Sequence, residues 1–285
     1  MGENGKITEL SDAGDPPVPP GIDPTVPSIA RVYDYFLGGK DNYAVDRKVA
    51  EEALKIAPDA REAGRANRTF LRRAVEYMTA EAGIRQFLDL GSGLPTQGNV
   101  HEIAQAIAPE ARVVYVDNDP VVLAHGRALL ATNDVTTVVE GDIRRPAEIL
   151  EHPEVLRFID FGEPVGMLLV SVLHHVHDDE DPDGIMERFR SVLAPGSHLA
   201  IVHFHNPGDE HPEASKIALE AERDFNRNLG TGRWRSRAEI AGYFGDMELI
   251  EPGLVPLADW RSEPEDLIRQ DVTRYNVLAG VGRRR

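Results

Sequence analysis

The chain has 285 residues, 41% of them hydrophobic, which suits a large soluble domain with a buried core. It contains no cysteine, which excludes disulfides, thiolate metal sites and cysteine nucleophiles. Its formal net charge of −17 disfavours nucleic acid and anionic membranes as partners. Because the sequence has neither a signal-peptide pattern nor a run apolar enough to span a bilayer, we expect a cytoplasmic protein.

The N-terminal part of the chain precedes the first predicted strand. Residues 1–27 are rich in proline and poor in apolar residues, which predicts a flexible tail. Three helical patterns follow, over residues 28–37, 45–57 and 70–83. Ser28 is a candidate N-cap of the first helix, and Gly38-Gly39 would end it. These helices predict an N-terminal helical segment over about residues 28–83.

From residue 87 onward, short apolar runs alternate with helical patterns. We expect strands at 87–90, 112–117, 136–139, 165–172, 198–204, 247–250 and 275–280. We expect helices at 99–108, 121–130, 185–193, 214–229 and 237–244. This alternation predicts an α/β fold, with a mostly parallel sheet, an antiparallel C-terminal strand and helices on both faces. We find no internal repeat and expect one domain over residues 28–285.

A glycine-rich loop follows the first predicted strand, in the order Asp89-Leu90-Gly91-Ser92-Gly93. In an open α/β sheet, ligands bind beyond the carboxyl ends of the strands, where the strand order reverses. Glycines at that place let the backbone turn sharply and let a ligand approach it closely. A dinucleotide site needs a third glycine at the position of Thr96, so the loop does not match that class of site.

Carboxylates after three consecutive predicted strands favour S-adenosylmethionine as the ligand. Asp89 precedes the glycines, where it suits a cofactor with a cationic methionine part. Asp117 ends the second strand, where a carboxylate can accept hydrogen bonds from both ribose hydroxyls. Asp142 can accept from the adenine amino group, with Ile143 covering the ring. Asp119 directly precedes a proline, so we expect it to cap the next helix.

The fourth predicted strand is followed by two adjacent histidines, His174 and His175. His174 is our candidate catalytic base, because an imidazole titrates near neutral pH. Two alternatives stay open. In the first, His174 hydrogen-bonds the backbone and closes the pocket. In the second, methyl transfer to a strong nucleophile needs only alignment and desolvation, without a base.

Several segments together resemble a predicted S-adenosyl methyltransferase family, formerly a domain of unknown function. The resemblance covers the chain from Pro27 to Arg285. It rests on Ala30-Arg31-Val32-Tyr33-Asp34-Tyr35-Phe36-Leu37-Gly38-Gly39-Lys40-Asp41-Asn42-Tyr43, Arg65-Ala66-Asn67-Arg68, Asp89-Leu90-Gly91-Ser92-Gly93-Leu94-Pro95-Thr96, Tyr115-Val116-Asp117-Asn118-Asp119-Pro120 and Leu173-His174-His175-Val176. It implies a Rossmann-like class I methyltransferase fold, S-adenosylmethionine as the cofactor and S-adenosylhomocysteine as the product. It implies no particular methyl acceptor, and we expect a small molecule.

The expected cofactor site combines the loop with its neighbours. Its members are Asp89, Gly91, Ser92, Gly93, Asp117, Asn118, Asp142, Ile143, Ser171, Tyr33 and Arg68. We further hypothesise that the helical segment forms a lid over the cofactor, with Tyr33 or Tyr43 lining the methyl channel. The alternative is that these tyrosines pack against the domain, as aromatic residues on short helices usually do. Arg68 is a candidate partner of the methionine carboxylate.

Other readings of the sequence remain. The first alternative is a noncatalytic protein that binds S-adenosylmethionine or S-adenosylhomocysteine. An acceptor channel with residues 206–236 as one wall would favour an enzyme instead. Trp234 or Trp260 could stack on an aromatic acceptor there, and the alternative for each is packing in the core. A second alternative is a metal-dependent enzyme using His203 and His205, which alternation places on one strand face. We expect no metal, and a nicotinamide dehydrogenase ranks below both alternatives. The sequence does not predict the oligomeric state.

Overall fold

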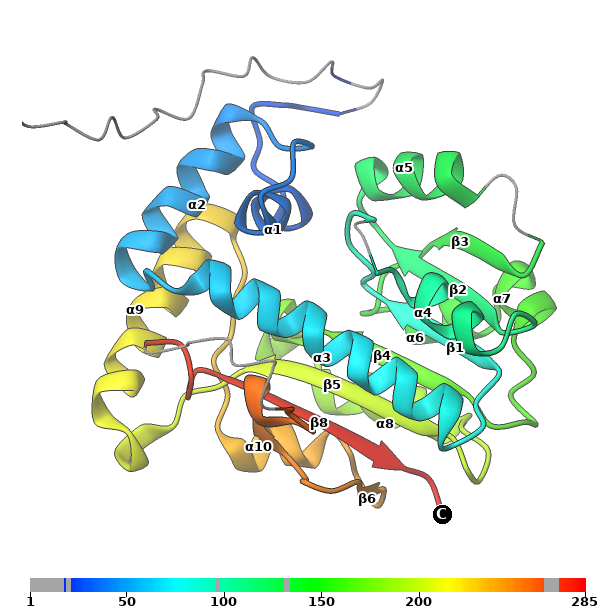
Figure 1. Ribbon diagram of the computed structural model, residues 1–285. Coiled ribbons are helices and arrows are strands. Elements are labelled where there is room, and N and C mark those ends of the chain that lie inside the picture. Colours follow the sequence, from blue (N-terminus) through cyan, green and yellow to red (C-terminus); the bar gives the residue numbers. More distant parts are fainter. Residues whose placement is uncertain (1–17, 19–21, 96–97, 131–133, 264–271) are drawn as a thin grey trace, which may run out of the picture.

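The structure is a computed structural model that describes residues 18, 22–95, 98–130, 134–263 and 272–285. An eight-stranded sheet runs through the described part of the chain (Figure 1). Its strands are β1 Gln86–Leu90, β2 Arg112–Asp117, β3 Thr136–Glu140, β4 Gly166–Val170, β5 His198–Phe204, β6 Glu248–Leu249, β7 Val255–Pro256 and β8 Val277–Arg283. The α-helices are α1 Ile29–Leu37, α2 Ala44–Ile56, α3 Ala60–Ala80, α4 Val100–Ile107, α5 Pro120–Leu130, α6 Pro146–Leu150, α7 Pro153–Phe158, α8 Pro182–Ser191, α9 Pro212–Leu229 and α10 Arg237–Gly242. Short 3₁₀ turns lie at η1 Leu173–His175, η2 Asp178–Glu180, η3 Gly208–Glu210 and η4 Leu257–Asp259.

The strand order places the end of β1 at a reversal point. The order is β3-β2-β1-β4-β5-β8-β6, with β7 also paired to β8. Strands β1 to β5 are parallel to their neighbours, whereas β8 runs antiparallel to β5 and pairs antiparallel with β6 and β7. The chain leaves β1 toward β2 and β3 on one side, then crosses to β4 on the other side of β1 and continues outward to β5. Such a reversal opens a crevice at the carboxyl ends of the strands. The predicted fold class is confirmed.

Side chains that alternate along the strands build two cores, one on each face of the sheet. On one face, Leu88 and Leu90 of β1 belong to a buried cluster with residues of α6, α7, α8 and α10. On the other face, Phe87 belongs to a cluster with residues of α3 and α4 and with Trp260. The sheet is thus covered on both sides, as a parallel sheet requires.

The predicted elements match the observed ones with a few differences. The third helix starts at Ala60 rather than near Phe70, and the fourth strand ends at Val170 rather than at Val172. Helices α6 and α7 have five and six residues, too short for a recognisable apolar period, and were not predicted. Ser28 occupies the N-cap position of α1, but its hydroxyl donates to Asp119 and does not cap the helix.

The N-terminal helices form a third apolar cluster beyond the carboxyl ends of the strands. Val32 and Phe36 of α1 pack with Val49, Ala50 and Ala53 of α2, and Phe225 and Leu229 of α9 complete the cluster. In Figure 1 these three helices lie together at one end of the molecule. Most of the predicted tail falls outside the described residues. Ile22, which is described, packs near Leu94 of the glycine-rich loop.

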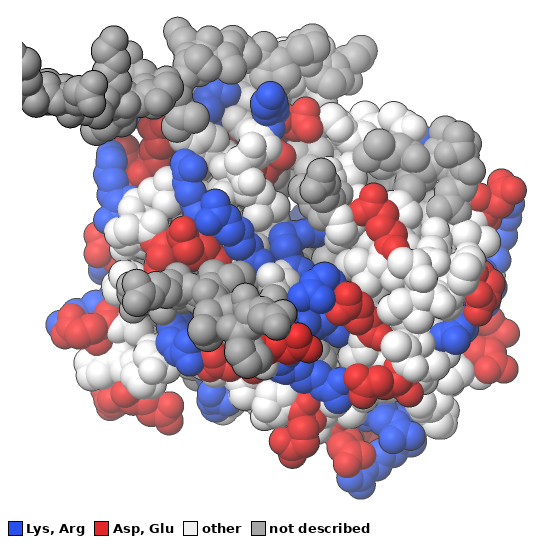
Figure 2. Space-filling model, viewed as in Figure 1, with Lys and Arg blue, Asp and Glu red and all other residues white. Residues whose placement is uncertain are grey.

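Two properties of the described residues bear on possible partners. No described helix combines the length and the apolar character that a membrane span requires. On the face shown in Figure 2, Lys and Arg side chains are interspersed with Asp and Glu.

A buried ion pair joins α1 to α2 and supports a stability prediction. Asp46 is fully buried and accepts hydrogen bonds from Arg31 Nε at 2.8 Å, from Ser28 N at 2.9 Å and from Tyr43 N at 2.8 Å. Asp46→Ala leaves the buried Arg31 charge and two amide groups without this partner. We expect the free energy of unfolding to fall by about 3–5 kcal/mol, measured by urea denaturation. Glu52→Gln, which alters the exposed pair with Lys55, is the control and should cost no more than about 0.5 kcal/mol. An equal effect of the two changes would contradict the prediction.

Candidate active site

A cavity of about 680 Å³ opens at the carboxyl ends of β1, β2, β4 and β5. This volume lies within the usual range for small-molecule sites. One half of the cavity is formed by the loops that follow β1, β2 and β3, and we call it the cofactor half. The other half lies between α1, α2, the start of α3 and α9, and we call it the inner half. All eleven predicted cofactor-site residues, together with His174, line this one cavity.

The glycine-rich loop is held to the neighbouring strand by its backbone. Gly91 N and Ser92 N both donate to the carbonyl of Val116, at 2.8 and 3.2 Å. Gly91 has φ of +70°, and a Cβ there would lie 2.3 Å from Val172 Cγ2. Gly93 has φ of +67°, and a Cβ there would meet no described atom within 4 Å. The backbone of Gly93 is therefore open to a close approach by a ligand.

Asp89 is a buried carboxyl group, with 6% of its surface exposed. Burial raises its pKa to about 7, the nearby Arg68 lowers it in part, and the Asp117 carboxylate raises it further. A cation placed next to Asp89 would favour the ionised carboxylate. Arg68 lies on α3, lines the cavity and donates from Nη2 to the Gly98 carbonyl at 2.6 Å.

Asp117 is oriented by the backbone around it. Its Oδ2 accepts from Gly93 N at 2.8 Å, and its Oδ1 accepts from Asp119 N at 2.9 Å. Burial raises the pKa of Asp117, and these backbone hydrogen bonds partly offset the rise. Asp119 Oδ1 accepts from Val121 N at 2.8 Å, which confirms the predicted cap of α5. Asn118, between the two acids, lines the cavity.

Asp142 lies at the far end of the cofactor half and is paired with an arginine. Burial opposes its ionisation, but hydrogen bonds from Arg144 outweigh this effect and lower its pKa. The closest contact is 2.6 Å, from Arg144 Nη2 to Asp142 Oδ2. Arg144 also reaches Glu180 at 3.0 Å. The buried side chain of Ile143 lies beside them and also lines the cavity. The pairing with Arg144 was not anticipated from the sequence.

A chain of hydrogen bonds joins the N-terminal helices to the end of β4. Tyr33 Oη donates to the Gly64 carbonyl at 3.2 Å and accepts from Asn67 Nδ2 at 2.9 Å. Asn67 Oδ1 in turn accepts from Ser171 Oγ at 3.0 Å. Ser171 has φ of +63°, an unfavourable conformation for a residue with a side chain, and such strain is often found at functional sites. We did not assign Asn67 a role from the sequence, although it lies within one of the resembling segments.

Two further contacts describe how the proposed lid sits on the cavity. Ser28 Oγ donates to Asp119 Oδ2 at 2.5 Å, so the start of α1 is joined to the loop after β2. Tyr33 lines the cavity, whereas Tyr43 is buried next to Arg31, whose guanidinium carbon is 5.1 Å from the ring centre. Of the two tyrosines that we considered, the structure therefore brings only Tyr33 to the cavity.

The two histidines after β4 differ in their surroundings. His174 Nδ1 accepts from Phe204 N at 3.3 Å, and its ring stacks on Phe204 with the ring centres 3.5 Å apart. Burial, together with nearby positive and imidazole groups, lowers its pKa well below the ordinary value, so the ring is neutral. His175 Nδ1 is buried and has no hydrogen-bond partner among the described atoms. Burial lowers the pKa of His175 to about 4. The backbone contact supports the alternative in which His174 closes the pocket.

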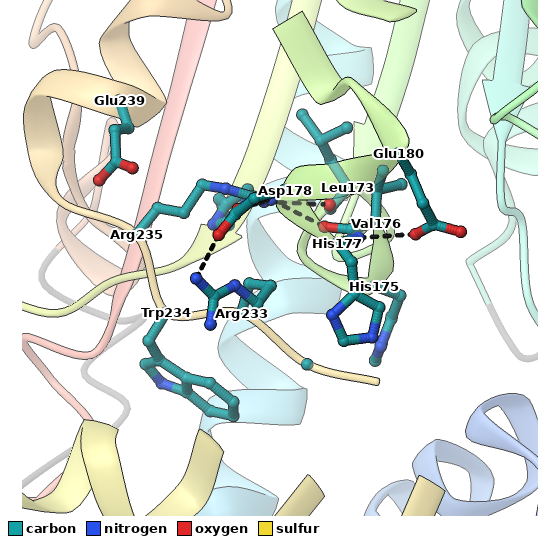
Figure 3. Close-up of polar contacts among 12 residues, drawn as sticks. Leu173, His175, Val176, His177, Asp178, Glu180, Arg233, Trp234, Arg235 and Glu239 are labelled. Carbon is teal, nitrogen blue, oxygen red and sulfur yellow. Dashed lines mark hydrogen bonds and ion pairs between the residues drawn. The ribbon is translucent and has the colours of Figure 1, made fainter. Parts of the chain in front are cut away.

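The segment after α9 forms one wall of the cavity, and arginines hold it in place. Arg233 and Arg235 both pair with Asp178, and Arg235 also donates to the carbonyl of Val176 at 2.7 Å (Figure 3). In the same view the ring of Trp234 points away from Asp178, as alternation along an extended segment requires. Trp234 stacks on Phe204 and lines the cavity. Trp260 is fully buried against Phe70 and belongs to the core instead.

His203 of β5 and His205, which follows β5, were the candidate metal ligands, and each has a protein partner. His203 Nε2 lies 3.0 Å from Arg235 Nη1, and His205 Nδ1 lies 2.7 Å from the Tyr275 carbonyl. A guanidinium at that distance occupies the place of a metal cation. Among the described residues, no three side chains of the types that ligate metals converge.

Comparisons with known proteins agree with this geometry. A family model described as S-adenosyl methyltransferase matches residues 17–285. A candidate methyltransferase from Thermobifida fusca is 47% identical, with a TM-score of 0.87 and coverage of 94% of this chain and 98% of that chain. A DUF574 family protein from Streptomyces avermitilis is 36% identical, with a TM-score of 0.85 and coverage of 91% and 98%. An O-methyltransferase family protein from Burkholderia thailandensis, 16% identical over 81% of this chain and 61% of that chain, has a TM-score of 0.50 and shares the fold alone. No curated protein matches the chain.

The raised pKa of Asp89 predicts a pH-dependent loss of stability. The folded protein binds the Asp89 proton more tightly than the unfolded chain does, because its folded pKa is about 7 against an ordinary 3.8. The stabilisation from that proton is complete below about pH 4 and is lost as the pH rises through 7. Asp89→Asn should therefore raise the free energy of unfolding at pH 8 by about 2–4 kcal/mol, and by much less at pH 5.

Urea denaturation of both proteins at the two pH values measures this difference. Asp179→Asn, which removes an exposed charge outside the cavity, is the matched control. A gain from Asp89→Asn that is equal at pH 5 and pH 8 would show that Asp89 is not the group responsible.

Proposed function

Because this chain belongs to the S-adenosyl methyltransferase family, we propose that it transfers a methyl group from S-adenosylmethionine to a small molecule bound in the inner half of the cavity. S-adenosylmethionine is the cofactor of the family. The observation that carries the proposal is the convergence of Asp89, Asp117 and Asp142 on one cavity that continues into a second, largely apolar chamber. The first part suits the cofactor, and the second provides room for an acceptor.

The residues of the cofactor half suit the parts of S-adenosylmethionine. Asp89 is a buried carboxyl group with a pKa near 7, and a neighbouring ammonium or sulfonium group would stabilise its ionised form. Asp117 accepts backbone hydrogen bonds from Gly93, Asn118 and Asp119. A carboxylate has about four acceptor sites, so Asp117 keeps acceptor capacity for the ribose. Asp142 and Ile143 provide an acceptor and an apolar surface for adenine. Arg68, whose charge acts on Asp89, would pair with the methionine carboxylate.

S-adenosylmethionine supplies a methyl group on a positive sulfur, and the carbon–sulfur electron pair stays on sulfur when the acceptor takes that methyl. The protein's contribution is then alignment and the exclusion of water. Tyr33, Asn67 and Ser171 enclose the cavity where its two halves meet. An acceptor that reacts through an O–H or N–H group must also release a proton. His174 is held by a backbone hydrogen bond, so its role as a base stays a prediction. The Nδ1 atom of His175 has no hydrogen-bond partner among the described atoms, but its pKa of about 4 makes it a weak proton acceptor.

The alternative of a noncatalytic binding protein accounts for less of the cavity. A protein that only senses the cofactor has no need for a second chamber walled by aromatic rings. The metal-dependent alternative lacks support, because Arg235 lies against His203. A small-molecule acceptor agrees with a cavity of about 680 Å³ better than a nucleic acid does.

Calorimetry on the full chain with S-adenosylmethionine, S-adenosylhomocysteine and NAD, in separate titrations, tests the proposal. We expect both adenosyl compounds to bind with 1:1 stoichiometry and NAD not to bind. Asp117→Ala should weaken the binding of S-adenosylhomocysteine by about 2–4 kcal/mol, because two charge-assisted hydrogen bonds to the ribose are lost. Binding of NAD in the absence of the other two would overturn the proposed function.

The lid predicted from the sequence gives a separate test. Tyr33→Phe removes the hydroxyl that joins α1 to Asn67 and Gly64. If α1 covers the bound cofactor, we expect the dissociation rate of S-adenosylhomocysteine to rise by about 5- to 10-fold, the equivalent of one hydrogen bond. Stopped-flow fluorescence of Trp234 is a suitable probe. Tyr35→Phe, on the same helix but outside the cavity lining, is the control. Unchanged dissociation in Tyr33→Phe would refute the lid.

A further inference from the structure

One face of α9 supplies much of the wall of the inner half. Ile217, Ala221, Asp224 and Phe225 lie on this face, spaced as successive helical turns, and all four line the cavity. Asp224 stands out because it is a carboxylate among apolar neighbours and only 5% of its surface is exposed. Charged side chains are rarely buried to this extent unless a partner compensates them.

The two oxygens of Asp224 differ in their contacts. Oδ1 accepts from Arg227 Nη2 at 2.9 Å and from Asn228 Nδ2 at 3.1 Å. Oδ2 is buried and has no hydrogen-bond partner among the described atoms. The Arg227 side chain is 69% exposed, so water screens its charge and the pair contributes little. An unsatisfied buried oxygen of this kind is costly, and one explanation is a ligand that donates to it.

The charges that line the cavity are unevenly distributed. Among the described lining residues, the only Lys or Arg side chains are Arg68 and Arg144, and both belong to the cofactor half. Asp224 is the only Asp or Glu in the described lining of the inner half. An anionic acceptor would therefore meet a carboxylate and no compensating cation, whereas a cationic acceptor would meet its counter-charge.

Three aromatic side chains line the same cavity as Asp224. Phe204 and Trp234 are stacked, with ring centres 4.1 Å apart and planes inclined by 15°. Phe225, the residue after Asp224, meets both rings edge-on, at 5.7 and 5.4 Å between centres. Such a cluster offers faces and edges to a flat apolar group, and its π-electrons also attract cations.

From the unpartnered oxygen, the charge distribution and the aromatic cluster, we propose that the acceptor is a small arylalkylamine, an aromatic ring that carries an aliphatic amine, in its protonated form. Its ammonium group donates to Asp224 Oδ2, and its ring packs against Phe225 and Trp234. The ammonium nitrogen in this contact has no lone pair, so the atom that receives the methyl group is a different atom of the same molecule. Asp224 thus selects and positions the acceptor. This inference rests on the proposed methyl transfer in the same cavity.

Three compounds of similar shape test the charge preference: 2-phenylethylamine, 2-phenylethanol and phenylacetate. Each is titrated by calorimetry at millimolar concentration into the full chain saturated with S-adenosylhomocysteine, which keeps the amine out of the cofactor half. We expect the cation to bind about 10-fold or more tightly than the alcohol and the anion not to bind. This ranking is measured on the unaltered protein and does not depend on any variant.

Asp224→Asn then tests the residue. The Asn side chain keeps an oxygen for Arg227 and Asn228 but loses the charge, so the affinity for 2-phenylethylamine should fall by about 10- to 100-fold. The affinities for 2-phenylethanol and S-adenosylhomocysteine should not change. Glu220→Gln removes an exposed carboxylate from the same helix, outside the cavity lining, and should leave all affinities unchanged.

The possible results separate this inference from the proposed function. Equal binding of the three compounds, no binding of the amine, or an amine affinity that Asp224→Asn leaves unchanged would each overturn the acceptor class. If the same protein still binds S-adenosylhomocysteine, the proposed methyl transfer stands. If it does not bind S-adenosylhomocysteine, both are overturned.

Discussion

The hydrogen-bonded position of β1 between β2 and β4 is the constraint on which the site depends. Asp89 pairs in register with Tyr115 of β2 on one side and with Leu168 of β4 on the other. Because all three strands are parallel, their carboxyl ends lie at the same edge of the sheet, and the connections from β1 and β4 diverge there. The glycine-rich loop, Asp117 and Ser171 thus meet at one crevice. The helices around the sheet build the cores that keep this register.

The position of β1 inside the sheet also buries the carboxyl group of Asp89, and this burial does not stabilise the fold. Strand β1 is buried along its whole length, so a carboxyl group at Asp89 is desolvated and titrates near neutral pH. Asp224 on α9 is also buried, and one of its oxygens has no hydrogen-bond partner among the described groups. Sites that are incomplete without their ligands commonly contain such groups. The two acids lie in opposite halves of one cavity, which agrees with two different ligands.

How much of the site could be predicted from the sequence depends on whether a residue lies at the end of a strand or on a helix. Asp117 and Asp142 follow strands, and the ends of parallel strands converge in every sheet of this class, so their positions in the sequence indicate their positions in space. Asn67 and Asp224 lie on helices, and only one side of each helix faces the cavity. Which face does so depends on how α3 and α9 pack, and that is not a local property of the sequence. The short helices α6 and α7 were not predicted because so few residues show no period.

The two halves of the cavity are built by separate parts of the chain, and this affects how proteins of this fold can change their methyl acceptor. The cofactor half is built from loops that follow β1 to β3, whereas the inner half takes its wall from α9 and the segment up to Arg235. Substitutions on the cavity-facing turns of α9 can therefore alter which acceptor is bound and leave the methyl donor's site intact. One scaffold of this design can acquire new acceptors through changes in a single helix. Exchange of α9 between relatives becomes a practical route for redirecting specificity.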